Sequence, residues 1–232
     1  MGETMTIPRA GASFTAYVAR PKAAKAPAVL VIQEIFGVNQ VMRETADAFA
    51  EAGYLAICPD LFWRIEPGIE LSDRSEADVK RAFELFSAFD VDKGVKDLGA
   101  TIAYARADRG CSGPVGSVGF CLGGLLAFLT ATRTDIDAAA CYYGVGIDQR
   151  IREADALVTP VMLHIAEEDQ FVSKSAQKTI IDALKNRSLA EMFTYPGCGH
   201  AFARKGGDHY NAEEAAKAWA RTASFFHTHL VR

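Results

Sequence analysis

The chain of 232 residues lacks most features of secreted, membrane or nucleic-acid-binding proteins. Its first eight residues have neither the basic start nor the apolar stretch of a signal peptide, and no later run is long enough to span a membrane. The formal net charge is only -4, and no basic stripe would attract a nucleic-acid backbone or an anionic membrane. We therefore expect a cytoplasmic protein without a nucleic-acid or membrane partner.

Cysteine is too scarce and too irregularly spaced for a disulfide framework. The five cysteines form an odd set, so at least one thiol must be free, as is usual in a reducing compartment. The pairs Cys198-x-His200 and His227-x-His229 have no second matching pair at zinc-like spacing, which argues against a metal site. We expect no metal and no organic cofactor.

What the chain does contain is an alternation of short apolar runs and amphipathic helical patterns, which predicts an α/β fold with a mainly parallel central sheet flanked by helices. Length and composition, with 50% hydrophobic and 23% charged residues, fit a single domain over residues 1–232. The predicted strands are residues 14–19, 28–33, 54–58, 115–120, 138–143, 161–166 and 191–195. The predicted helices are residues 41–52, 76–89, 93–107, 123–131, 174–185 and 212–230. The irregular segment 63–73 could border a pocket.

The strongest chemical signal is the segment Val118-Gly119-Phe120-Cys121-Leu122-Gly123-Gly124. It matches the strand-turn-helix motif of the nucleophile elbow, with Cys121 in the nucleophile position. The sharp turn requires Gly119 and Gly123 because a Cβ atom there would collide with neighbouring backbone. It also leaves Cys121 at a helix N-terminus, where the helix dipole favours the reactive thiolate. The alternatives are a small buried core cysteine, or a phosphate-binding turn, for which no G-x-G-x-x-G pattern is found.

A nucleophilic thiol needs a base and an acid that orients the base. His200 lies in a glycine-rich loop after the last predicted strand, and Asp169 follows the predicted strand 161–166 at its carboxyl end. Glu167 and Glu168 compete with Asp169 for the role of the acid. The order of nucleophile, acid and base along the chain is that of α/β-hydrolases. The sequence therefore predicts a catalytic triad of Cys121, Asp169 and His200.

Three further motifs accompany the elbow at residues 119–124. They are Gln33-Glu34-Ile35-Phe36-Gly37, Tyr142-Tyr143-Gly144 and Gly199-His200-Ala201-Phe202-Ala203-Arg204. Together the four motifs make the chain resemble the dienelactone hydrolases, also called carboxymethylenebutenolidases, over nearly its whole length. The resemblance implies an α/β-hydrolase fold and assigns Cys121, His200 and Asp169 to the triad.

The resemblance also implies roles for residues outside the triad. Glu34 would contact the thiol and take part in its activation, and the backbone N–H groups of Ile35 and Leu122 would form the oxyanion hole. The side chains expected to contact the substrate are Arg204, which would pair with a carboxylate, and Tyr142, Phe36 and Phe83.

The chain departs from the family pattern near residue 80. Val79 stands where the second carboxylate-binding arginine is expected, and the aromatic positions nearby are Phe83 and Phe86, which have no polar donor. Arg81 could replace the missing arginine after a shift of one turn, although Lys80 and Arg81 fit the solvated face of that helix better. The identity of the acid substrate is therefore open.

The expected activity is hydrolysis of a small lactone or enol ester such as dienelactone through a cysteine acyl-enzyme. A general carboxylesterase, or a hydrolase of another lactone with the same triad, is the first alternative. A thiol-sensing or binding protein on a hydrolase scaffold is the second. The partner expected in each case is a small molecule, and the chain is expected to be a monomer or a homodimer.

Overall fold

The computed structural model describes residues 2–231 and divides the chain into two compact units that meet in the sequence at Ser117 and Val118. Strand β5 (Cys111–Phe120) contains this boundary. The prediction of one domain over residues 1–232 stays a prediction.

The first unit is built on four strands in addition to the beginning of β5. They are β1 (Glu3–Arg9), β2 (Ala12–Ala19), β3 (Ala26–Ile32) and β4 (Leu55–Pro59). Strands β1 and β2 form an antiparallel hairpin, β2 pairs antiparallel with β4, and β4 pairs parallel with β3. All five residues of β4 are buried, as are six of the seven in β3, because both faces of these central strands are covered.

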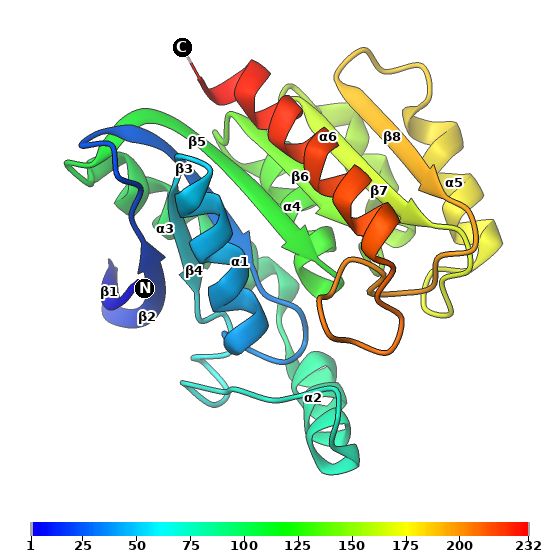
Figure 1. The fold of residues 1–232 in the computed structure, drawn as a ribbon, viewed down its shortest axis with the longest axis horizontal. Coiled ribbons are helices and arrows are strands. Elements are labelled where there is room, and N and C mark those ends of the chain that lie inside the picture. Colours follow the sequence, from blue (N-terminus) through cyan, green and yellow to red (C-terminus); the bar gives the residue numbers. More distant parts are fainter. Residues whose placement is uncertain (1, 232) are drawn as a thin grey trace. The chain divides into compact units, whose positions relative to one another are not determined.

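Three helices complete the first unit, and each begins at a residue whose side chain accepts a hydrogen bond from a first-turn N–H group. They are α1 (Gln40–Glu51), α2 (Glu76–Ala88) and α3 (Val91–Ala107), with Asn39, Ser75 and Asp90 as their N-caps. Figure 1 shows α1 on one face of β3 and β4 and α3 on the other.

The second unit continues from the end of β5 into three parallel strands. They are β6 (Ala138–Tyr142), β7 (Val161–Ala166) and β8 (Ala190–Tyr195), and β7 pairs with both of the others. Its helices are α4 (Leu122–Arg133), the 3-10 helix η1 (Asp148–Ala156), α5 (Lys174–Leu184) and α6 (Ala212–Leu230). Helix α6 crosses β6 and β7 on one face, while α4 packs against β6 on the other (Figure 1).

The alternating strands and helices confirm the predicted α/β class, and each predicted element is present with ends shifted by only a few residues. Strand β1 and helix η1 were not predicted. Strand β1 contains Pro8 and lies at the edge of its sheet, where a missing backbone donor is tolerated. None of the helices within residues 2–231 has an apolar run long enough to cross a membrane.

Candidate active site

Cys121 occupies a sharp turn between β5 and α4, as the elbow motif predicts. Its φ of 56° and ψ of -115° lie outside the usual helix and strand regions, and its N–H donates to the carbonyl of Tyr142 at 3.1 Å. A Cβ atom at Gly119 would lie 1.9 Å from the carbonyl oxygen of Gly123, so no other residue fits there without moving the helix. The missing Cβ atom of Gly119 therefore permits the close crossing of strand β5 and helix α4.

The start of α4 places the backbone N–H of Leu122 directly after the residue that carries the thiol. The carbonyl of Cys121 accepts from Gly124 N at 3.0 Å and from Leu125 N at 3.4 Å, so helical hydrogen bonding begins only with these residues. Leu122 is the first residue of the helix, and N–H groups in this position have no intrahelical acceptor. This is the position of a donor suited to an oxyanion.

Asp169 and His200 are joined by a buried hydrogen bond. The Nδ1 atom of His200 lies 2.8 Å from Oδ2 of Asp169, and both residues are buried. The other oxygen, Oδ1, accepts from the backbone N–H groups of Phe171 at 2.8 Å and Val172 at 3.1 Å. Glu168 instead pairs with a lysine at the surface. Among the three neighbouring acids, Asp169 therefore has the geometry to orient the imidazole.

The surroundings of His200 favour its protonated form. Burial by itself lowers the pKa of His200, but the hydrogen bond with Asp169 and the interactions with Cys121 together raise this pKa to about 10. The Nε2 atom is buried and has no partner within hydrogen-bonding geometry among the described residues. An imidazole held in this way can accept a proton from the nearby thiol, forming a thiolate and an imidazolium.

Aromatic rings enclose the imidazole of His200. Tyr143 and Phe171 contact it edge to face, with ring centroids 5.0 and 4.9 Å away, and Phe202 packs against Tyr143 at 5.7 Å. Phe171 is about half exposed, whereas the other two rings are buried. Sequence reasoning missed Phe171, although its place two residues after Asp169 was a usable signal. The rings limit the movement of the imidazole and keep water away from its pair with Asp169.

The side chain of Tyr142 is buried, and its contact with the substrate stays a prediction. Its hydroxyl forms a 2.7 Å hydrogen bond with Thr222 of α6, within the core. The same threonine lies 2.9 Å from Nε2 of His164, whose Nδ1 lies 2.7 Å from the hydroxyl of Tyr195. Burial lowers the pKa of His164 to about 3, so this histidine is neutral. The hydroxyl of Tyr142 thus belongs to a buried network, and the backbone carbonyl of Tyr142 accepts a hydrogen bond from the N–H of Cys121.

The predicted residues of the first unit follow β3 directly. Glu34, Ile35 and Phe36 are all buried. The side chain of Gln33 accepts from Leu61 N at 3.0 Å and donates to the carbonyl of Glu34 at 3.3 Å. The Glu34 carbonyl and the Ile35 N–H belong to one peptide group, so these contacts also fix the direction of that N–H.

Helix α2 presents Phe83 and Arg81 to solvent. Phe83 is 41% exposed, and Arg81 forms ion pairs with Glu66 at 2.5 Å and Glu84 at 3.0 Å. These contacts agree with the interpretation of Arg81 as part of a solvated helix face.

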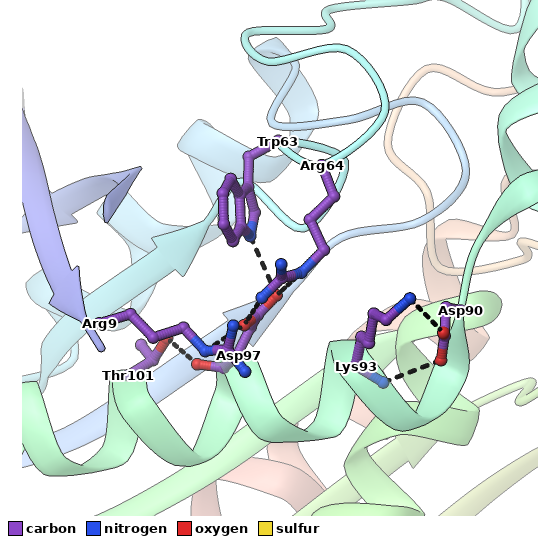
Figure 2. Close-up of polar contacts among 7 residues, drawn as sticks. All are labelled: Arg9, Trp63, Arg64, Asp90, Lys93, Asp97 and Thr101. Atoms are coloured by element: carbon purple, nitrogen blue, oxygen red, sulfur yellow. Dashed lines mark hydrogen bonds and ion pairs between the residues drawn. The ribbon is translucent and has the colours of Figure 1, made fainter. Parts of the chain in front are cut away.

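The buried carboxylate of Asp97 anchors the segment that follows β4. The sequence analysis did not predict this role of Asp97. Figure 2 shows Asp97 of α3 accepting from the indole N–H of Trp63 at 2.9 Å and from Arg64 at 2.8 and 3.0 Å. Arg9 forms an ion pair with the same carboxylate at 2.9 Å. The irregular segment 63–73 is therefore anchored at its start, and residues 68–70 line a hollow of about 170 Å³.

The cysteines and histidines do not form a metal centre within residues 2–231, where no three His, Cys, Asp or Glu side chains are grouped suitably. All five cysteines are free thiols and buried. Burial raises the pKa of both Cys58 and Cys141 far above the usual range of a thiol. These two thiols are therefore unreactive at neutral pH.

Comparison with known proteins identifies the family. The family model described as "Dienelactone hydrolase family" matches residues 14–230. The chain belongs to the dienelactone hydrolase family. A carboxymethylenebutenolidase of Pseudomonas putida is 40% identical over 215 residues, covering 93% of this chain and 91% of the relative. A carboxymethylenebutenolidase of Cupriavidus pinatubonensis is 37% identical over 214 residues, covering 92% and 91% of the two chains.

A solved structure of a candidate dienelactone hydrolase from Klebsiella pneumoniae extends the comparison to the fold. It superposes with a TM-score of 0.86 and 29% sequence identity, covering 97% of this chain and 98% of the other. The chain thus has the α/β-hydrolase fold predicted from its motifs. Membership of the dienelactone hydrolase family also makes it a hydrolase of ester or lactone bonds.

Proposed function

We propose that this member of the dienelactone hydrolase family hydrolyses a small cyclic enol ester, such as a dienelactone, through an acyl-enzyme on Cys121. The observation that carries the proposal is the buried hydrogen bond between Asp169 and His200, in the same unit as the strained Cys121 turn. Relatives named carboxymethylenebutenolidase support the class of substrate.

In the first half of the proposed reaction, Nε2 of His200 takes the proton of the Cys121 thiol. The thiolate sulfur then forms a bond with the carbonyl carbon of the lactone, and the carbonyl oxygen becomes an oxyanion. When the oxyanion reverts to a carbonyl, the bond from this carbon to the ring oxygen breaks and the ring opens, so that the enolate stays attached to the acyl group. A thioester on Cys121 is the product of this half-reaction.

In the second half, water attacks the thioester carbon and gives its proton to the enolate of the same acyl group, because the imidazole still carries the proton of the thiol. The carbon–sulfur bond breaks, the thiolate is regenerated and the acid product leaves. Because an ordinary ester leaves no internal base on the acyl group to accept the proton of water, its thioester is expected to hydrolyse slowly. An enolate that can act as an internal base suits the site better.

The remaining roles in the proposal follow the family resemblance. The N–H groups of Ile35 and Leu122 stabilise the oxyanion, and losing one such donor typically costs about 10² to 10³ in rate. Glu34 takes part in activating the thiol. Arg204 pairs with a substrate carboxylate, and Phe36 offers an apolar contact. Phe83 and Tyr142 remain predicted substrate contacts on the same basis.

A second candidate function is hydrolysis of general carboxylic esters or another lactone by the same triad. The absence of an arginine at Val79, together with the ion pairs of Arg81 with Glu66 and Glu84, favours this candidate. Without the second arginine, a substrate carboxylate would lose one of its expected charged partners.

Hydrolysis of a dienelactone and of simple aryl esters by the wild type and Cys121→Ala tests both candidates. Rapid dienelactone turnover that depends on Cys121 would support the proposal, and turnover of esters alone would favour the second candidate. Absence of any Cys121-dependent turnover would contradict both and leave a thiol sensor or binding protein. Cytoplasmic location, a monomeric or homodimeric state, and the lack of nucleic-acid and membrane partners remain proposals based on composition.

A further inference from the structure

The loop that carries Asp169 has no regular structure, yet it positions the acid against His200. This loop, residues 167–173, connects β7 with α5. A side chain from α5 reaches back across it: Nε2 of Gln177 donates to the carbonyl of Val172 at 2.8 Å and to the carbonyl of Glu167 at 3.2 Å. Gln177 is only 5% exposed, so water does not easily substitute for these contacts.

The two carbonyls lie on either side of Asp169 in the sequence, two residues before it and three after it. An amide NH₂ group has two hydrogens, and here each is directed to one end of the loop. Val172 also donates its N–H to Oδ1 of Asp169 at 3.1 Å, while Oδ2 faces His200. A continuous series of contacts thus leads from Gln177 through Val172 and Asp169 to the imidazole.

The loop has a second, longer contact with the base. The side-chain oxygen of Gln170 accepts from the backbone N–H of His200 at 3.4 Å. The N–H of Glu168 donates to the carbonyl of Cys198 at 2.8 Å, which links the same two loops through their backbones. A displacement of the Asp169 loop is therefore expected to disturb both partners of the hydrogen bond.

We propose that Gln177 is a positioning residue for the acid of the triad, an inference that rests on the proposed function. Its amide closes the Asp169 loop and holds Oδ2 at the distance and angle that His200 requires. Without the amide, the buried carbonyl of Val172 and the partly buried carbonyl of Glu167 must find water or move apart, because unpaired buried acceptors are costly. Either change loosens the alignment of Asp169 and His200.

The test compares Gln177→Met with Thr159→Val. The methionine keeps the length and volume of the side chain but donates no hydrogen bond. Thr159 provides the matched control because it is also buried and donates to a backbone carbonyl, that of Ile136 at 3.1 Å, but lies before β7 rather than after it. Both variants lose buried hydrogen bonding, whereas only Gln177→Met loses the closure of the loop.

Steady-state hydrolysis and alkylation of Cys121 are measured for both variants. For Gln177→Met we expect kcat to fall about 10-fold with KM changed less than about 3-fold, because a small misalignment acts on the proton transfer more than on binding. The midpoint of Cys121 alkylation against pH should rise by about one pH unit, because a less stable imidazolium stabilises the thiolate less. Asp169→Asn should shift this midpoint in the same direction.

Wild-type kinetics and an unshifted alkylation midpoint in Gln177→Met would overturn the inference while leaving the proposed function intact. Equal losses in Gln177→Met and Thr159→Val would also overturn it, since the effect would then follow stability alone. A wild type without Cys121-dependent turnover would overturn both proposals. If Gln177→Met does not fold, Gln177→Asn serves instead, because its amide is one methylene too short to reach both carbonyls.

Discussion

Replacing Asp169 with asparagine keeps the shape of the acid but reverses the hydrogen bond that it makes with His200. The backbone N–H groups of Phe171 and Val172 both donate to Oδ1, so the oxygen of an asparagine would remain there. Its NH₂ group would then face Nδ1 of His200, which would have to act as an acceptor. The imidazole would carry its proton on Nε2 and could no longer accept the proton of the Cys121 thiol.

The size of the effect follows from this change of tautomer. The same substitution in a serine triad lowers kcat about 10⁴-fold, and we expect about 10³ to 10⁴ here. Such a loss corresponds to about 4 to 5.5 kcal/mol of transition-state stabilisation. The pKa of His200, now raised to about 10 in part by Asp169, should fall. Steady-state hydrolysis gives the first quantity, and NMR titration of the imidazole gives the second.

Glu168→Gln is the matched control for this prediction. It removes the same charge one residue away, but Glu168 is exposed and pairs with Lys174 at 3.0 Å. Its kcat should stay within about 2-fold of the wild type, because exposed ion pairs contribute little. The reasoning is refuted if Asp169→Asn retains more than about a tenth of wild-type kcat, or if both variants lose activity equally.

Three further predictions concern the buried histidine His164, the reactivity of the thiols and the buried carboxylate of Asp97. His164 is neutral in the folded protein, so its imidazole takes up a proton on unfolding between about pH 3 and pH 6.5. This uptake should lower the free energy of unfolding by about 1.4 kcal/mol for each unit by which the pH falls through that range. Urea unfolding of His164→Gln should show less acid sensitivity, and an unchanged slope would contradict this. Iodoacetamide at pH 8 should label Cys121 before Cys58, whose pKa is raised by burial, and peptide mass analysis showing the reverse order would refute the prediction. Asp97→Asn should cost about 1.5 to 3 kcal/mol in urea unfolding because the buried side chain loses its charge-assisted hydrogen bonds with Arg9 and Arg64. Arg81→Ala, which removes exposed ion pairs, should leave the melting temperature nearly unchanged, and equal effects of the two changes would argue against this account of Asp97.

The parts of the site that sequence reasoning predicted depend on local backbone rules. Gly119 and Gly123 indicate the elbow by their spacing around Cys121, and the structure leaves no room for a Cβ atom at Gly119. His200 and Asp169 were found because α/β proteins gather polar residues at the carboxyl ends of strands. The geometry around Asp169, rather than any pattern, distinguishes it from its acidic neighbours.

The parts that sequence reasoning missed depend on contacts between distant residues. Gln177 looks like an ordinary helical glutamine until α5 is folded against the loop before it. The hydroxyl of Tyr142 turns toward Thr222, which is 80 residues away in the sequence. Asp97 follows no motif, and only the fold brings Trp63 and Arg64 to its carboxylate. Such roles for buried polar residues arise from packing, so periodicity and spacing do not reveal them.

The most direct test of the central claim is to mix the protein with an aryl ester, quench early, and locate the acyl group by mass spectrometry. The account predicts a burst of aryl alcohol stoichiometric with protein and an acyl thioester on Cys121. Both should be lost in Cys121→Ala and kept in Cys58→Ala, which removes a buried, unreactive thiol. Undiminished turnover by Cys121→Ala, or an acyl group on another residue, would contradict the claim that Cys121 is the nucleophile.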